Sequence, residues 1–279
     1  GAVIGLKNSK VAIMSVLADN PAVKAGLLAN DLILEINDES TDEMTVDLAV
    51  SKIRGEAGTT VKLKIQRGAE IKDFTVTRAV VNNPSVISKI ENNVGIMTIS
   101  RFDDSTGSLA KLAAKGFVKE GVRSVILDLR DNPGGYVDSA VDVASLWLDN
   151  QVVVTEQKNG VVVETFKSDS EAVLKGVPTV VLVNNNSASA SEIVSGALQD
   201  HKVAKIVGEQ TFGKGSVQQL IDINGGAQLK VTVARWYTPN GRNITKDGIT
   251  PDTTAMLTQA NVDAGVDPQL DKARELLAL

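Results

Sequence analysis

Short apolar runs separated by turn residues occupy the first eighty positions of the chain, which predicts a small, β-rich unit. Within it, Pro21–Gly26 is typical of a short helix that ends on glycine. Thr45–Arg54 has the apolar spacing of an amphipathic helix. The pattern therefore predicts a first domain over residues 1–80, which precedes the turn-forming sequence Asn-Asn-Pro. Its predicted strands are Val11–Val16, Asp31–Asn37, Val61–Arg67 and Phe74–Ala79.

A different pattern begins after this turn, where apolar strands alternate with segments of helical spacing. A helix capped by Asp104 or Ser105 is predicted to run to about Lys119. Because strands and helices alternate, we expect parallel crossovers in a layered α/β domain that covers residues 81–279. The predicted strands are Val94–Ile99, Val122–Leu129 and Thr179–Val183, and the further helices are Val137–Leu148 and Ser189–Leu198.

One hairpin interrupts this alternation. The strand-like segments Val152–Thr155 and Val161–Phe166 flank Lys-Asn-Gly, a strong turn signal. We interpret residues 151–176 as a β-hairpin insertion that projects from the α/β core. The tail adds a predicted strand at Leu229–Trp236 and a final helix near Pro268–Ala278.

Composition narrows the functional classes. Hydrophobic residues make up 43% of the 279 positions and charged residues 23%, as in ordinary globular proteins. The net charge of −5 comes without a block of basic residues, which argues against nucleic acid and anionic membranes as partners. The absence of cysteine excludes thiolate metal sites and cysteine nucleophiles, and the single histidine, His201, excludes a histidine-rich metal site.

No apolar run approaches the ~20 residues that a membrane-spanning helix needs, and no signal peptide is recognisable. The chain begins at Gly1 instead of Met, directly in a strand-like segment. We interpret it as a piece of a longer protein, so the missing targeting segment carries no weight.

Two stretches join a buried strand to a helix through residues suited to acyl transfer. In LDLRDNPGGY, the paired Gly134 and Gly135 let the backbone approach another group and present N–H donors, which could bind an oxyanion. In NNNSASASEIVSGALQD, serines open a helix whose N-terminus favours a developing anion. The residues alone do not choose between Ser187, Ser189 and Ser191, and the serines could simply cap the helix.

The third stretch, GEQTFGKGSVQQ, nearly spells a phosphate-binding Walker A loop. It has Gly215 where the magnesium-binding Ser or Thr would stand, and it leads into a strand, so we reject nucleotide binding. A lysine between glycines has another use. Burial favours the neutral amine of a lysine, and neutral Lys214 could then act as general base toward a serine. The alternative is a solvated loop lysine.

Together these sequence motifs resemble those of the carboxyl-terminal-processing (tail-specific) serine peptidase family, whose members also carry a PDZ domain. LDLRDNPGG, SASASEIVSGALQD, GEQTFGKGSVQQ and YTPNGRNITKDGITPD occur in the family's order, and NPAVKAGLLANDLILEINDES resembles the bacterial PDZ pattern. The resemblance spans residues 1 to about 252. It implies a PDZ domain followed by a crotonase/Clp-like α/β peptidase core.

The resemblance also implies roles for individual residues. The middle serine of SASASE, Ser189, is expected to be the nucleophile, Lys214 the general base, and Gln218 a residue that orients this dyad. The oxyanion hole is expected at the N–H of Ala190 and of Gly134 or Gly135. Two accessory candidates are Asp200, from the family's Gln-Asp pair, and Arg54, a contact for PDZ gating of the dyad.

The implied activity is endopeptidase cleavage of proteins near flexible carboxyl termini, with neither metal nor nucleotide nor other cofactor. An extracytoplasmic location is expected, in the periplasm or cell envelope, with an anchoring segment outside this chain as one option. A homo-oligomer is also left open. The competing hypotheses are a Ser–His201 arrangement, a non-catalytic ligand-binding relative such as the retinoid-binding proteins of this fold, and a PDZ adaptor. The complete Ser189, Lys214 and Gln218 pattern disfavours all three.

Overall fold

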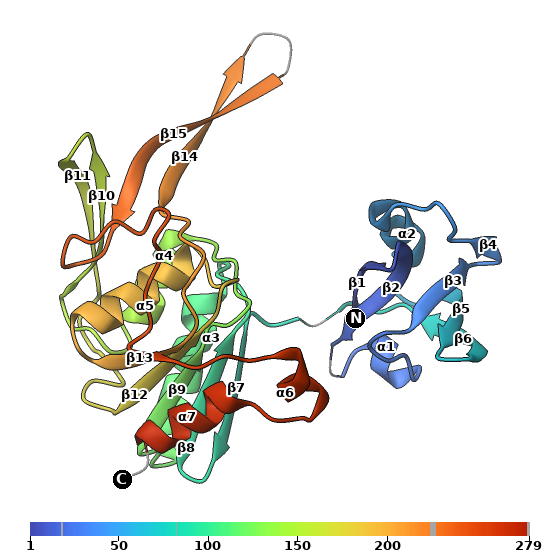
Figure 1. The fold of residues 1–279 in the computed structure, drawn as a ribbon, viewed down its shortest axis with the longest axis horizontal. Coiled ribbons are helices and arrows are strands. Elements are labelled where there is room, and N and C mark those ends of the chain that lie inside the picture. The colour runs from blue at the N-terminus through green and yellow to red at the C-terminus, as the bar shows by residue number, and fades with distance from the viewer. Residues whose placement is uncertain (18, 82, 224–226, 278–279) are drawn as a thin grey trace. The chain divides into compact units, whose positions relative to one another are not determined.

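A computed structural model describes residues 1–17, 19–81, 83–223 and 227–277. The chain folds into two compact units, Gly1–Pro84 and Ser85–Leu279 (Figure 1). The sequence pattern places this boundary slightly earlier, at residue 80. Within the described ranges, none of the helices combines the length and the apolar character that crossing a membrane requires.

The first unit is an antiparallel sheet with two helices. Its strands lie in the order β1-β2-β3-β5-β6, and β4 pairs with β3. Gly26 ends α1 with a φ of +85°, as its position in the sequence predicts. The elements are β1 (Ala2–Lys7), β2 (Lys10–Val16), α1 (Pro21–Lys24), β3 (Leu32–Ile36), β4 (Glu39–Ser40), α2 (Val46–Ile53), β5 (Thr60–Arg67) and β6 (Glu70–Thr77).

An ion pair closes the edge of this unit's core. The Asp31 carboxylate is fully buried and accepts two hydrogen bonds of 2.7 Å from Arg67 and one of 2.9 Å from Leu28 N–H. Burial alone would raise the pKa of Asp31, but the bonds from Arg67 and Leu28 outweigh burial and hold this pKa below its usual range. Breaking such a pair would leave an unpaired charge in the core.

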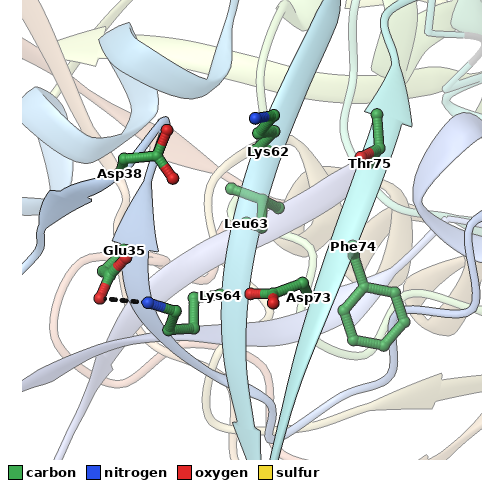
Figure 2. A pocket seen from close by; sticks show the side chains of 8 residues that line it. All are labelled: Glu35, Asp38, Lys62, Leu63, Lys64, Asp73, Phe74 and Thr75. Carbon is green, nitrogen blue, oxygen red and sulfur yellow. Dashed lines mark hydrogen bonds and ion pairs between the residues drawn. The ribbon is translucent and has the colours of Figure 1, made fainter.

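A shallow hollow of about 280 Å³ lies on the same sheet (Figure 2). Lys64 donates a 2.6 Å hydrogen bond to Glu35 at its border, and charged side chains make up most of its wall. The hollow contains none of the residues that the sequence predicts for catalysis. Its lining residues are Glu35, Asp38, Lys62, Leu63, Lys64, Asp73, Phe74 and Thr75.

The second unit is built on a mostly parallel sheet with the order β16-β13-β12-β9-β8-β7, in which β7 alone is antiparallel to its neighbour. This arrangement is the layered α/β core that the alternating strands and helices predict. Its strands are β7 (Val86–Glu91), β8 (Val94–Ile99), β9 (Ser124–Asp128), β12 (Thr179–Val183), β13 (Ala204–Gly208) and β16 (Thr253–Thr254).

Helices cover both faces of this sheet. Successive strand residues point to opposite faces, so Val125 and Leu127 join one core cluster while Ile126 joins another. Side chains of α3, α4 and α5 belong to the first cluster, and those of α7 belong to the second. The helices of this unit are α3 (Thr106–Lys119), α4 (Val137–Ala144), α5 (Ala190–Asp200), α6 (Gln259–Asp263) and α7 (Pro268–Leu277).

Two hairpins form a second sheet beside this core, with the order β11-β10-β15-β14 (Figure 1). The turn signal at Asn159-Gly160 does connect two strands, but β10 also pairs with β15, so the hairpin is one side of a larger sheet. Phe166 packs edge-on against Trp236 with ring centroids 5.6 Å apart. The strands are β10 (Val152–Lys158), β11 (Val161–Lys167), β14 (Ser216–Ile223) and β15 (Ala227–Tyr237).

Candidate active site

The three chemically suggestive stretches meet at one edge of the parallel sheet. They follow β9, β12 and β13, which are adjacent and parallel. Parallel strands bring their carboxyl ends to the same edge, which is where open α/β sheets place their sites. Contacts between these loops define the candidate site.

The structure separates the three serines that the sequence leaves as alternatives. Ser187 is buried and donates a 2.8 Å hydrogen bond to Leu129 O. Ser191 is also buried and donates to Asn132 O at 3.0 Å. Ser189 is half-buried, and none of the described hydrogen bonds uses its hydroxyl as a donor. Of the three, Ser189 therefore has the hydroxyl available for chemistry.

Ser189 has a strained backbone at the start of α5. Its φ of +55° and ψ of −114° fall in a region that residues with a side chain rarely adopt. Strain of this kind persists only where the surroundings hold it. Here the Asn132 carbonyl accepts hydrogen bonds from both sides of Ser189, from Ala188 N–H at 3.0 Å and from the Ser191 hydroxyl. The bend presents the Ser189 side chain at the N-terminus of a helix.

The carboxylate of Glu192, in the first turn of α5, joins Ser189 to the loop between β13 and β14, residues 209–215, which carries Lys214 and is called the lysine loop below. It is fully buried. Its Oε2 accepts hydrogen bonds from Ser189 N–H at 2.8 Å and from Lys214 N–H at 2.9 Å. Its Oε1 accepts from Gly213 N–H and from the Thr211 hydroxyl, both at 2.6 Å. Because the backbone N–H groups of Ser189 and Lys214 donate to the same oxygen atom, the backbones of these two residues lie close together.

The paired-glycine turn lies against the serine. A Cβ at Gly134 would come within 2.7 Å of Ser189 Cβ and 2.9 Å of Ala190 N, so only glycine fits there. The sequence leaves Gly134 and Gly135 as alternative oxyanion donors. Gly134 N–H is already engaged, because it donates to Asn132 Oδ1 at 2.9 Å. Among the described hydrogen bonds, none uses Gly135 N–H or Ala190 N–H, which leaves these two groups free to bind an anion.

Lys214 matches the second of the two alternatives that the sequence leaves open, a solvated loop lysine. It lies in the loop between β13 and β14, its side chain is exposed, and no described hydrogen bond joins its amine to the Ser189 hydroxyl. Gln218 is exposed on β14, beside a shift in the pairing register with β15. The backbone of the lysine loop is thus fixed, while the amine remains in water.

Asp200 cannot touch the serine, because it ends the helix that Ser189 begins, about 16 Å away along the axis. Its buried carboxylate pairs with Arg242 and accepts from Asn240 N–H at 2.8 Å. This fixes the segment after β15, from which Lys246 N–H donates to Gly213 O at 2.9 Å. Asp200 is therefore connected to the loop that carries Lys214 through this segment.

The two remaining candidates lie elsewhere. His201 follows Asp200 at the far end of α5, where its ring contacts Val152 O at 2.7 Å, so the structure does not support a Ser–His pair. Arg54 ends α2 in the first unit with an exposed side chain. Among the described residues, no cluster of three or more His, Asp or Glu side chains is placed to hold a metal ion.

Sequence reasoning missed Glu192 and Asn132. Glu192 stands three residues after Ser189, the spacing of a capping box, and this signal could have been used. The other partners of these side chains lie in segments remote in sequence, so nothing local reveals them.

Comparison with known proteins matches this architecture. The profile of peptidase family S41 matches residues 93–255, and that of the PDZ domain matches residues 2–77. A probable CtpA-like serine protease of Staphylococcus haemolyticus is 40% identical over 255 residues, which cover 91% of this chain and 51% of that protein. A relative of the same name from Staphylococcus epidermidis is 38% identical over 256 residues. The chain spans about half the length of these curated relatives.

Solved structures show the same fold. The photosystem II D1 C-terminal processing protease is 29% identical, with a TM-score of 0.60 over 91% of this chain and 71% of its own. A putative S41 protease from Bacteroides fragilis is 20% identical, with a TM-score of 0.63 over 99% of this chain and 79% of its own. At that identity the second similarity concerns the fold alone.

The Glu192 arrangement predicts a large effect for a substitution that keeps the shape of the side chain. Glu192→Gln replaces one acceptor oxygen by an NH2 group, which faces N–H donors in a buried place. We expect a loss of about 2–3 kcal/mol in the free energy of unfolding, measured by urea denaturation. The matched control Glu164→Gln changes an exposed carboxylate on β11 and should cost less than about 0.5 kcal/mol. Equal, small losses in both variants would contradict the assigned role of Glu192.

Proposed function

The chain belongs to peptidase family S41, and we propose that it is a serine endopeptidase that cleaves proteins near flexible carboxyl termini, with Ser189 as nucleophile and Lys214 as general base. The observation that carries this proposal is the shared carboxylate of Glu192, which binds the backbone N–H groups of both residues. No other described serine is tied to a lysine in this way. The chemistry follows from the positions of these groups.

The first step needs a proton acceptor for the Ser189 hydroxyl. The side chain of Lys214 is exposed, and none of the described hydrogen bonds joins its amine to the Ser189 hydroxyl. We propose that a substrate chain lying over the site removes water from this amine, favours its neutral form and aligns it with the serine. Neutral Lys214 then accepts the proton as Ser189 Oγ bonds to the scissile carbonyl carbon. The protonated amine later donates to the leaving nitrogen, and water hydrolyses the acyl-enzyme.

The negative charge on the carbonyl oxygen needs donors that are already in place. Gly135 N–H and Ala190 N–H are both free in the described structure, and Ala190 is the first residue of α5, where the helix dipole favours an anion. Because Gly134 N–H is engaged by Asn132, we assign the second donor to Gly135. Preorganised donors of this kind account for a large share of the rate in acyl transfer.

Substrate recognition is proposed for the PDZ domain in residues 1–84. Strand β1 ends the sheet order, so one of its edges is unpaired among the described strands, and α2 packs against it. A carboxyl-terminal peptide could add to this edge as a further strand. We also propose that bound substrate gates the dyad through this domain, with Arg54 as a contact, and that the protein works outside the cytoplasm, as family membership suggests.

The dyad proposal is tested by hydrolysis of casein. Ser189→Ala and Lys214→Ala should each lower the rate at least about 1,000-fold, because a nucleophile and its base act as a unit. Ser88→Ala and Lys205→Ala are matched controls, an exposed serine on β7 and an exposed lysine on β13, and should keep most of the activity. Circular dichroism establishes that each variant is folded. A folded Ser189→Ala protein that still cuts would refute the proposal.

PDZ gating has a separate test, in which a chain lacking residues 1–80 is compared with Arg54→Ala and with the intact protein. If the domain gates the dyad, both changes should alter the rate on unfolded protein by about tenfold or more, while the rate of Ser189 labelling by a small serine-directed reagent changes less. Lys24→Ala, which alters an exposed cation in α1, is the control for Arg54→Ala. Unaltered proteolysis in both would rule gating out.

A further inference from the structure

The chain enters the second unit through a network of side-chain hydrogen bonds. Ser85, the first residue of this unit, is buried. Its hydroxyl donates to Asp103 Oδ1 at 3.1 Å and accepts from the Thr106 hydroxyl at 2.8 Å. Its carbonyl accepts from Ser100 N–H at 2.9 Å. The start of the unit is thereby tied to residues 100–106, which connect β8 to α3.

Asp103 is the centre of this network. Its Oδ1 also accepts from the hydroxyl and the N–H of Ser105, at 2.6 and 3.0 Å, and its Oδ2 pairs with Arg101 at 2.8 Å. The hydrogen bond from the Ser105 hydroxyl is the largest influence on this carboxyl, and with the other donors it outweighs burial and lowers the pKa of Asp103 to about 2. The group is therefore a carboxylate at neutral pH.

The residue next to Asp103 holds the paired-glycine turn. Phe102 is buried, its N–H donates to Gly134 O at 3.0 Å, and its carbonyl accepts from Tyr136 N–H at 2.9 Å. These two bonds lie on either side of Gly135. A Cβ at Gly135 would overlap the Phe102 carbonyl, so the two backbones are in close contact.

A second tie comes from α4, the helix that follows the turn. The Ser139 hydroxyl donates to the Asp103 carbonyl at 2.8 Å. The Asp103 carboxylate thus fixes the backbone of residues 102–103. This backbone forms hydrogen bonds with the paired-glycine turn and with α4, the helix that follows the turn. Such fixing is needed, because glycines at φ of +98° and +148° have little conformational preference of their own.

From these contacts we propose that Asp103 is a positioning residue for the oxyanion hole, acting through the Phe102 backbone on Gly135 N–H. The inference rests on the proposed peptidase function. Asp103 touches no reacting atom. It keeps a flexible turn in the one arrangement in which the Gly135 N–H can meet the charge that develops on the carbonyl oxygen.

The test compares Asp103→Asn with Asp104→Asn, which changes the exposed neighbouring carboxylate. We expect Asp103→Asn to lower kcat about tenfold per folded molecule with KM within about twofold, because the turn is displaced and not removed. A peptide aldehyde, whose adduct with Ser189 carries an oxyanion, should lose affinity by the same factor. Asp104→Asn should leave kcat, KM and the aldehyde Ki unchanged.

A purely structural role would give another result. The melting temperature of Asp103→Asn would fall while kcat per folded molecule and the aldehyde Ki stayed at the wild-type values, and this would overturn the inference. If Asp103→Asn does not fold, Ser139→Ala and Ser85→Ala remove single ties to the same network. A smaller drop in kcat, matched by the rise in aldehyde Ki, supports the inference, and normal values in both variants refute it.

The Ser189→Ala protein separates this inference from the proposal on which it rests. Activity that survives in Ser189→Ala would end the peptidase proposal itself. Activity that depends on Ser189 but is indifferent to Asp103 would end only the positioning role.

Discussion

The buried carboxylate of Glu192 is the interaction on which the candidate site depends. A charge without access to water is tolerated only where hydrogen-bond donors surround it. Glu192 has four, and three of them are the backbone N–H groups of Ser189, Gly213 and Lys214. Satisfying one charge therefore brings the two loops that carry the dyad into a fixed relation.

Other hydrogen bonds in the site hold backbone conformations that these residues would not favour by themselves. Ser189 and the paired glycines adopt conformations with φ well above zero. Asn132 contacts both. Its side-chain amide accepts a hydrogen bond from Gly134 N–H and donates one to Ile99 O, and its backbone carbonyl accepts from Ala188 N–H and the Ser191 hydroxyl. The backbone of Phe102, next to Asp103, forms hydrogen bonds with Gly134 and Tyr136 of the same turn. Hydrogen bonds thus hold the backbone of the site, while the side chain of Lys214 is exposed.

The sequence predicts the layers of the core because buried parallel strands such as β12 are almost entirely apolar, with four apolar residues after Thr179. It does not predict β7, because the apolar residues Val86, Ile87 and Ile90 do not alternate with polar ones as in a half-buried strand. The strand order that brings the three loops together comes from the structure. The sequence also cannot choose among the serines, because that choice depends on Leu129 and Asn132 as acceptors. The sequence leaves open whether Lys214 is buried or solvated, because the exposure of a loop side chain depends on what covers it.

The most direct test of this account is amide hydrogen exchange by NMR in the wild-type protein and in Glu192→Gln. If one carboxylate supports both loops, exchange at Ser189, Gly213 and Lys214 should accelerate together in the variant, while Val181 in the core of β12 keeps its protection. If Ser189 exchanges faster and the amides of Gly213 and Lys214 do not change, Glu192 supports only its own helix, and the shared-carboxylate account is wrong.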